Sequence, residues 1–120
     1  MSRTVHEIQS LEEADAWMER STPVWLFKYS NACGFSETQW RVFEQFGRSG
    51  RQYEAARVVV QKHRDVSDHI ARRLGVRHET PQVLLVRGGR CLWNGSHSQI
   101  TEAALKDAEQ QASEPGWQDR

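Results

Sequence analysis

The thirteen-residue stretch 24–36 constrains the fold of this 120-residue chain more than any other. It opens with an apolar run too short for a helix, and a turn-prone triplet then leads to Cys33. Beyond Cys33, apolar residues recur at roughly the 3.6-residue period of an α-helix, at Phe35, Val42 and Phe46. The stretch therefore predicts a buried strand over 24–29, a tight turn, and a helix over about 34–46 that begins at Cys33.

Cys33 at the start of a helix would be a reactive thiol. The unpaired amides and the positive end of the helix dipole favour a thiolate there, which is the nucleophilic form. Such sites lower the pKa of a cysteine from about 8.5 to roughly 3.5–7.5. The structural alternative is that Cys33 is a small buried hydrophobic residue. Its predicted place at a turn, rather than inside a strand or helix, favours the reactive thiol.

Ser36 stands where a dithiol oxidoreductase has its second cysteine. A hydroxyl cannot form a disulfide, but it can donate a hydrogen bond to a Cys33 thiolate. We therefore predict Cys33 and Ser36 as the catalytic residues of a monothiol site. Ser36 could equally be an ordinary residue of the first helical turn.

Composition excludes several classes of function. Lys+Arg and Asp+Glu number 16 each, so no overall charge favours nucleic acid or an anionic membrane. No apolar segment is long enough for a signal peptide or a membrane span, and we expect a cytoplasmic protein. With only Cys33 and Cys91, we expect no disulfide framework, and the five scattered histidines predict no metal site. Cys91 is expected to be a packing residue.

The remaining expected elements alternate between strand and helix. Before the stretch 24–36 we expect a short edge strand over 5–9 and a helix capped by Ser10 and Glu13. After it we expect a strand over 56–60 and a helix that begins at Asp65 or Ser67 and ends at Gly75. Two strands over 82–86 and 90–93, joined by a Gly88–Gly89 turn, and a helix from Thr101 complete the order. Gly47 and Gly50 are expected to end the helix that follows Cys33.

This order predicts an α/β fold with a mixed sheet of four to five strands and helices on both faces. One domain should span residues 1–112, and residues 113–120 should form a disordered tail. Pro81 begins the strand over 82–86 and cannot donate to a sheet ladder. It fits best as a turn residue at the strand entrance, where the cis form is a candidate.

The sequence resembles the thioredoxin superfamily, in which a cis-proline loop faces the active cysteine. It is most similar to the monothiol bacilliredoxins, the YtxJ-like general stress proteins of bacteria that use bacillithiol in place of glutathione. The similar residues keep their order along most of the chain: 25–28 with Ser30, Cys33 with Ser36, 66–67 with 70–71, 75–76, 80–82, 93–94, 96–97 and 100–101.

The resemblance implies a thioredoxin-like fold and a thiol–disulfide oxidoreductase. Cys33 would remove bacillithiol, or a similar low-molecular-weight thiol such as glutathione, from S-thiolated client proteins. That thiol would be a co-substrate, and no cofactor would be bound permanently. Thr80 and Pro81 would shape the substrate groove, although they could also form a purely structural turn. Lys28 and His97 could add positive charge near Cys33 or contact the thiol ligand. His97 could instead cap the last helix or do neither, and we expect a monomer.

One departure from the family supports a different hypothesis about function. Residues 33–36 spell CGFS, the signature of monothiol glutaredoxins that bridge a [2Fe-2S] cluster between two subunits with glutathione. The glutathione-binding residues of those proteins are incomplete here, because the segment 95–98 contains no aspartate. Iron–sulfur binding is therefore the second hypothesis. A redox-inactive adaptor of thioredoxin fold that binds a partner during stress is the third.

Overall fold

The structure, a computed structural model, describes residues 4–32 and 34–113. Its elements follow the predicted order: β1 (Val5–Glu7), α1 (Leu11–Met18), β2 (Val24–Tyr29), α2 (Gly34–Arg48), β3 (Ala55–Val59), α3 (Arg64–Leu74), β4 (Gln82–Arg87), β5 (Arg90–Ser96), a short 3-10 helix (His97–Gln99) and α4 (Glu102–Ser113).

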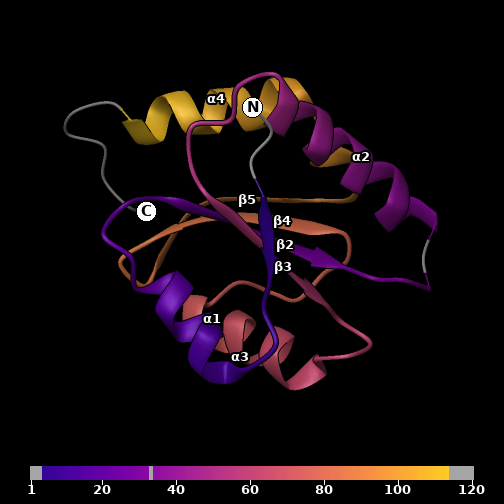
Figure 1. Cartoon of the computed structure of the whole chain (residues 1–120), viewed down its shortest axis with the longest axis vertical. Helices are drawn as coiled ribbons and strands as arrows, with labels where there is room; N and C mark the ends of the chain where they lie inside the picture. The colour runs from indigo at the N-terminus through magenta and orange to yellow at the C-terminus, as the bar shows by residue number, and fades with distance from the viewer. Residues whose placement is uncertain (1–3, 33, 114–120) are drawn as a thin grey trace.

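The five strands form one mixed sheet in the order β1-β3-β2-β4-β5. β3 pairs in parallel with β1 and β2, whereas β4 pairs antiparallel with β2 and β5. Helices α1 and α3 cover one face, and α2 and α4 cover the other (Figure 1). This arrangement is the predicted thioredoxin-like α/β fold, and β1 is the predicted edge strand.

β2 is buried on both faces because it lies in the middle of the sheet. Val24 and Leu26 pack into the core beneath α1 and α3, and Trp25 and Phe27 pack into the core beneath α2 and α4. An apolar run without alternation is typical of a strand in this position. It explains why residues 24–29 were recognisable as a strand.

Several local signals have the predicted effect. The Ser10 hydroxyl accepts from the Glu13 N–H at 3.1 Å and caps α1. Gly75 ends α3 with φ 67°, in the left-handed region that favours glycine. Gly88 and Gly89, at φ 57° and 78°, form the β4–β5 turn.

Other boundaries were predicted wrongly. α2 continues through Gly47 to Arg48, because Phe43 and Phe46 anchor it to the core and offset the low helix propensity of one glycine. Phe35 was assigned to the apolar face of this helix, but it is 40% exposed. The N-cap of α3 is His63, so neither Asp65 nor Ser67 caps that helix.

At the C-terminal side, β5 does not end at Trp93 but runs on to Ser96, because residues 94–96 keep pairing with β4. α4 includes Ser113, which was assigned to the tail, and residues 114–120 lie outside the described residues.

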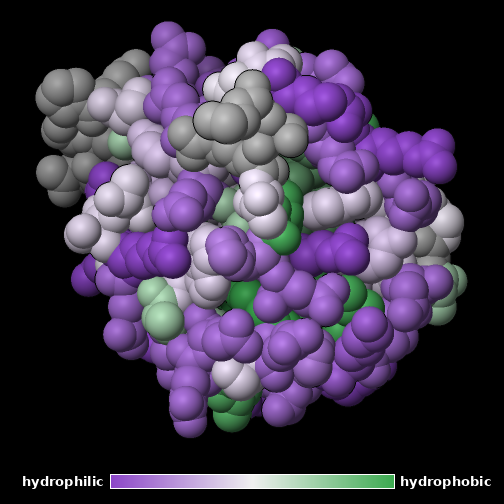
Figure 2. Space-filling view, viewed as in Figure 1, coloured by the Kyte–Doolittle hydropathy of each residue, from purple (hydrophilic) through white to green (hydrophobic). Residues whose placement is uncertain are grey.

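The surface in Figure 2 is mostly hydrophilic, with apolar side chains visible as small separate areas. This agrees with the mean hydropathy of −0.76. None of the helices within residues 4–32 and 34–113 has the length and apolarity needed to cross a membrane.

Candidate functional site

The predicted site residues gather at one end of the sheet. Lys28 of β2 pairs with Gln82 of β4, which pairs with Ser96 of β5, so the end of β2, the start of β4 and the end of β5 are aligned. Thr80 and Pro81 immediately precede β4, and His97 immediately follows β5. Ser36 lies in the first turn of α2, which follows β2. Cys33 itself lies outside the described residues.

The turn between β2 and α2 is held by hydrogen bonds on both sides. The Ser30 hydroxyl oxygen accepts from Gln61 Nε2 at 2.7 Å and from the Ala32 N–H at 3.3 Å. Gln61 also accepts from the Asn31 N–H at 3.0 Å. From the helix side, the fully buried Ser36 accepts from the Ser30 N–H at 3.3 Å. In that bond Ser36 is the acceptor, not the donor.

The Thr80–Pro81 peptide bond is cis. Pro81 is buried, Thr80 is half-buried, and the Pro81 carbonyl oxygen accepts from the His97 N–H at 3.0 Å. This bond ties the entrance of β4 to the residue that follows β5. The loop of Thr80 and Pro81, which was predicted to shape the substrate groove, is therefore held in place by a hydrogen bond from the residue that follows β5.

His97 connects this loop to α2. Its carbonyl oxygen accepts from Gln39 Nε2 at 2.6 Å, and Gln39 also donates to the Ile100 carbonyl at 3.0 Å. The exposed imidazole stacks on the ring of Phe35, with centroids 6.2 Å apart and an interplanar angle of 8°. Its Nε2 lies 3.7 Å from a Glu79 carboxylate oxygen. Phe35 and His97 thus present adjoining rings to solvent beside the loop of Pro81.

Lys28 lies in a different environment, beneath α3 on the opposite face of the sheet. It is fully buried, and its amine donates to the Ser67 carbonyl at 3.0 Å and lies 3.3 Å from His78 Nδ1. Ser67 Oγ is also 3.1 Å from that nitrogen. Burial lowers the pKa of Lys28 to about 8, although the negative charge of Asp68 acts in the other direction and raises it. Burial and then the Lys28 charge lower the pKa of His78.

Lys28 therefore supports the segment that leads to Thr80, since His78 is two residues upstream. The prediction that it also contacts a thiol ligand stays a prediction. The same holds for the ligand contacts of Thr80, Pro81 and His97.

Four residues of the site were missed from the sequence: Phe35 as an exposed ring, Gln39, Gln61 and His78. Gln39 had a signal, because it stands four residues before Phe43 and seven before Phe46, on the buried stripe of α2. A polar residue on such a stripe needs buried partners. Gln61 and His78 had no comparable signal, since their partners are distant in sequence.

Cys91 lies at the other end of the hairpin, paired with Val86 and next to the Gly88–Gly89 turn. It is half-buried, and its thiol donates to the Trp93 carbonyl oxygen at 3.3 Å. This placement agrees with a packing role. In the part of the chain that the structure describes, no three His, Cys, Asp or Glu side chains form a group that could hold a metal ion.

Solved structures identify the class of protein. One, described as "a putative oxidoreductase with a thioredoxin fold", is 30% identical, with a TM-score of 0.80, and the match covers 88% of this chain and 93% of that chain. The thioredoxin Mala s 13 of Malassezia sympodialis has a TM-score of 0.73 at 20% identity, covering 95% and 96% of the two chains. Thioredoxin from Trypanosoma brucei brucei has a TM-score of 0.72 at 18% identity, covering 92% and 91%.

These likenesses establish the thioredoxin fold. Residues 6–105 match the family described as monothiol bacilliredoxin BrxC, which is most of the chain. The protein belongs to this family, as its sequence motifs predicted, and together the matches support a monothiol thiol oxidoreductase.

Proposed function

We propose that this protein removes bacillithiol from protein mixed disulfides in the cytoplasm during stress, with Cys33 as the nucleophile. The family match over residues 6–105 is the observation that carries this proposal. The buried serine at position 36 and the cis peptide before Pro81 support it, because they suit a single-cysteine site beside an extended thiol ligand.

The proposed reaction is a thiol–disulfide exchange. The Cys33 thiolate attacks the bacillithiol sulfur of the mixed disulfide, and the S–S bond to the client breaks. The client sulfur leaves as a thiolate and takes up a proton, while Cys33 now carries bacillithiol in a new disulfide. No net oxidation or reduction occurs in this step, because one disulfide replaces another.

Regeneration of Cys33 needs a second thiol, because Ser36 cannot attack the adduct. A free low-molecular-weight thiolate would attack the bacillithiol sulfur of the adduct. The products would be a disulfide between bacillithiol and that second thiol, and the free Cys33 thiolate. Free bacillithiol or glutathione would serve as this co-substrate, and a partner reductase could replace it.

The test compares two cysteine variants on one bacillithiolated client, with release of the client thiol followed by mass spectrometry. Cys33→Ser should abolish release, and Cys91→Ser should retain most of it. The opposite pattern would show that the nucleophile is assigned wrongly. A glutathionylated copy of the same client, run in parallel, identifies which thiol is preferred.

The CGFS tetrapeptide at 33–36 favours one other function, which is binding of a [2Fe-2S] cluster. Anaerobic reconstitution with iron, sulfide and either glutathione or bacillithiol distinguishes the two. A dimer that absorbs visible light and is lost in Cys33→Ser would replace the first proposal with this one. A colourless monomer would eliminate it.

A further inference from the structure

A cavity of about 580 Å³ lies between the edge strand β1, strand β3 and the C-terminal half of α2. It is separate from the site described above, because α2 begins at the site and the cavity lies against its later turns. β1, which borders the cavity, is an edge strand of only three residues. Its volume is typical of small-molecule pockets, which span roughly 300–1,000 Å³.

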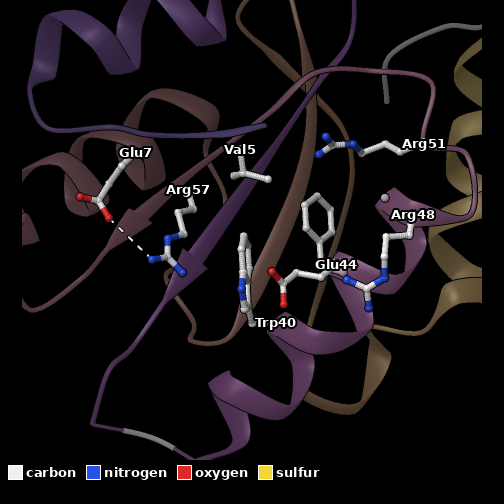
Figure 3. Close-up of a pocket in the computed structure, with 9 residues that line it drawn as sticks. Val5, Glu7, Trp40, Glu44, Arg48, Arg51 and Arg57 are labelled. Atoms are coloured by element: carbon white, nitrogen blue, oxygen red, sulfur yellow. Dashed lines mark ion pairs between the residues drawn. The ribbon is translucent and has the colours of Figure 1, made fainter. Parts of the chain in front are cut away.

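Three arginines from three parts of the chain line this cavity: Arg48 at the end of α2, Arg51 in the following loop and Arg57 on β3. Figure 3 shows them on different sides of the same space, with Glu44 between Arg57 and Arg48. Arg51 is only 4% exposed. Three guanidinium groups around one cavity form a site for an anion, because a planar guanidinium can bind phosphate or carboxylate through two hydrogen bonds.

Aromatic rings form another part of the lining. Trp40 and Phe43 both line the cavity, with ring centroids 5.8 Å apart; Phe43 is buried and Trp40 is half-buried, so Trp40 supplies the accessible ring. The Arg57 guanidinium lies 4.8 Å from the Trp40 ring centroid, so this side chain is held against an aromatic face. Such a surface can pack against a planar ring of a ligand.

Two carboxylates limit how much negative charge the cavity can accept. Glu7 pairs with Arg57 at 3.7 Å, and Glu44 is exposed at the rim. Among the described residues that line the cavity, three positive and two negative side chains leave a formal excess of one positive charge. This balance suits a ligand with one phosphate better than one with a di- or triphosphate chain.

We propose that this cavity binds a small organic phosphate with a planar ring, of which a nucleoside monophosphate is the simplest probe. The phosphate would pair with Arg48 and Arg57, beside the buried Arg51, and the ring would lie against Trp40. The proposal does not depend on the oxidoreductase function, because it uses no residue of that site.

Isothermal titration calorimetry of the full chain tests the proposal with three probes: AMP, adenosine and ribose 5-phosphate. AMP should bind, and each half-molecule should bind at least about tenfold more weakly, because each lacks one of the two kinds of contact. Absence of AMP binding would overturn the proposal. Equal binding of adenosine would overturn the phosphate assignment, and equal binding of ribose 5-phosphate would overturn the ring assignment.

Matched arginine variants locate the site. Arg57→Gln and Arg48→Gln should each weaken AMP binding by about tenfold or more. Arg41→Gln is the control, because it also removes one positive charge from α2, the helix of Arg48. The Arg41 side chain is 76% exposed and does not line the cavity, so this variant should leave AMP binding unchanged. Backbone NMR shifts on AMP addition should fall in 40–48 and 57. Equal affinity in all variants, or shifts confined to 30–36 and 80–81, would overturn the proposal.

Discussion

The amine of Lys28 lies 3.3 Å from Nδ1 of His78, beneath the segment that carries the cis Thr80–Pro81 bond. The two residues are 50 positions apart, and Ser67 of α3 accepts a hydrogen bond from the same amine. This contact joins the strand that leads to Cys33 to the loop predicted to hold the thiol ligand. It also places a cation where its charge is costly, which has consequences for stability.

Stability should rise with pH between about 8 and 10.5 because of Lys28. Burial lowers its pKa from 10.5 in the unfolded chain to about 8 in the folded chain. Below pH 8 both states are protonated, and the cost of burying the charge is fully present. Above pH 8 the folded state loses the proton first, so the free energy of unfolding increases, by about 3 kcal/mol at most.

Urea unfolding at pH 7.5, 8.5 and 9.5 measures this effect. The wild type should gain stability over this range relative to Lys28→Met, in which the group is absent. Both chains keep their cysteines, so thiol titration cancels in the comparison. Lys106→Met, at an exposed lysine of α4, should behave like the wild type. Equal pH dependence in the wild type and Lys28→Met would refute the prediction.

Glu109→Gln should destabilise the fold by about 2–4 kcal/mol. The buried Glu109 carboxylate of α4 accepts from the Trp25 indole N–H at 2.8 Å and from the Gln52 and Tyr53 amides at 3.0 and 3.4 Å. Glutamine would replace one acceptor oxygen with a donor and remove the charge from these bonds. Denaturant unfolding measures the loss. Asp107→Asn, on the exposed side of the same helix, should cost about 0.5 kcal/mol or less, and an equal loss in both would contradict this account.

Two glycine-to-alanine changes should have opposite consequences. A Cβ on Gly95 would lie 2.7 Å from Cη2 of Trp93, whose ring packs on Trp25, so Gly95→Ala must displace the indole. We expect a loss of about 1–3 kcal/mol. A Cβ on Gly34 would meet nothing within 4 Å, and Gly34→Ala should leave stability unchanged or raise it by up to about 1 kcal/mol. Thermal unfolding of the two variants checks this, and similar losses in both would be inconsistent with the packing described.

Ser36→Cys should convert the monothiol site to a dithiol site. Residue 36 lies in the first turn of α2, three positions after Cys33, which is the spacing of Cys-X-X-Cys motifs at helix starts. Mild oxidation should form a disulfide between Cys33 and the introduced thiol, detectable by peptide mapping. Exchange should then release the low-molecular-weight thiol instead of leaving a long-lived mixed disulfide. A link between Cys33 and Cys91, or two free thiols in the oxidised sample, would show that Cys33 is placed wrongly.

The sequence predicted the order of elements because the strongest signals are local. The apolar run at 24–29 and the glycines at 75 and 88–89 act through their own backbone or burial preferences. The prediction that Gly47 ends α2 was wrong because the effect of this glycine depends on packing by Phe43 and Phe46, which no local pattern measures. Helix boundaries shift when tertiary contacts outweigh propensity.

The site was only partly predictable for a related reason. Its residues could be found individually, but nothing nearby in sequence indicates that the amine of Lys28 contacts Ser67 of α3 and His78. The contact of His97 with Gln39 likewise joins segments 58 residues apart. The arginine-lined cavity depends on the crossover from β2 to β3, which brings Arg57 beside Trp40.

Trapping the exchange intermediate tests the central claim most directly. The protein is mixed with one equivalent of a bacillithiolated client without any free thiol, quenched with acid, and analysed by intact mass and peptide mapping. The account predicts a free client thiol and one bacillithiol adduct, located on Cys33, in the wild type and in Cys91→Ser. An adduct on Cys91, a Cys33–Cys91 disulfide, or an unmodified protein beside an unchanged client would contradict it.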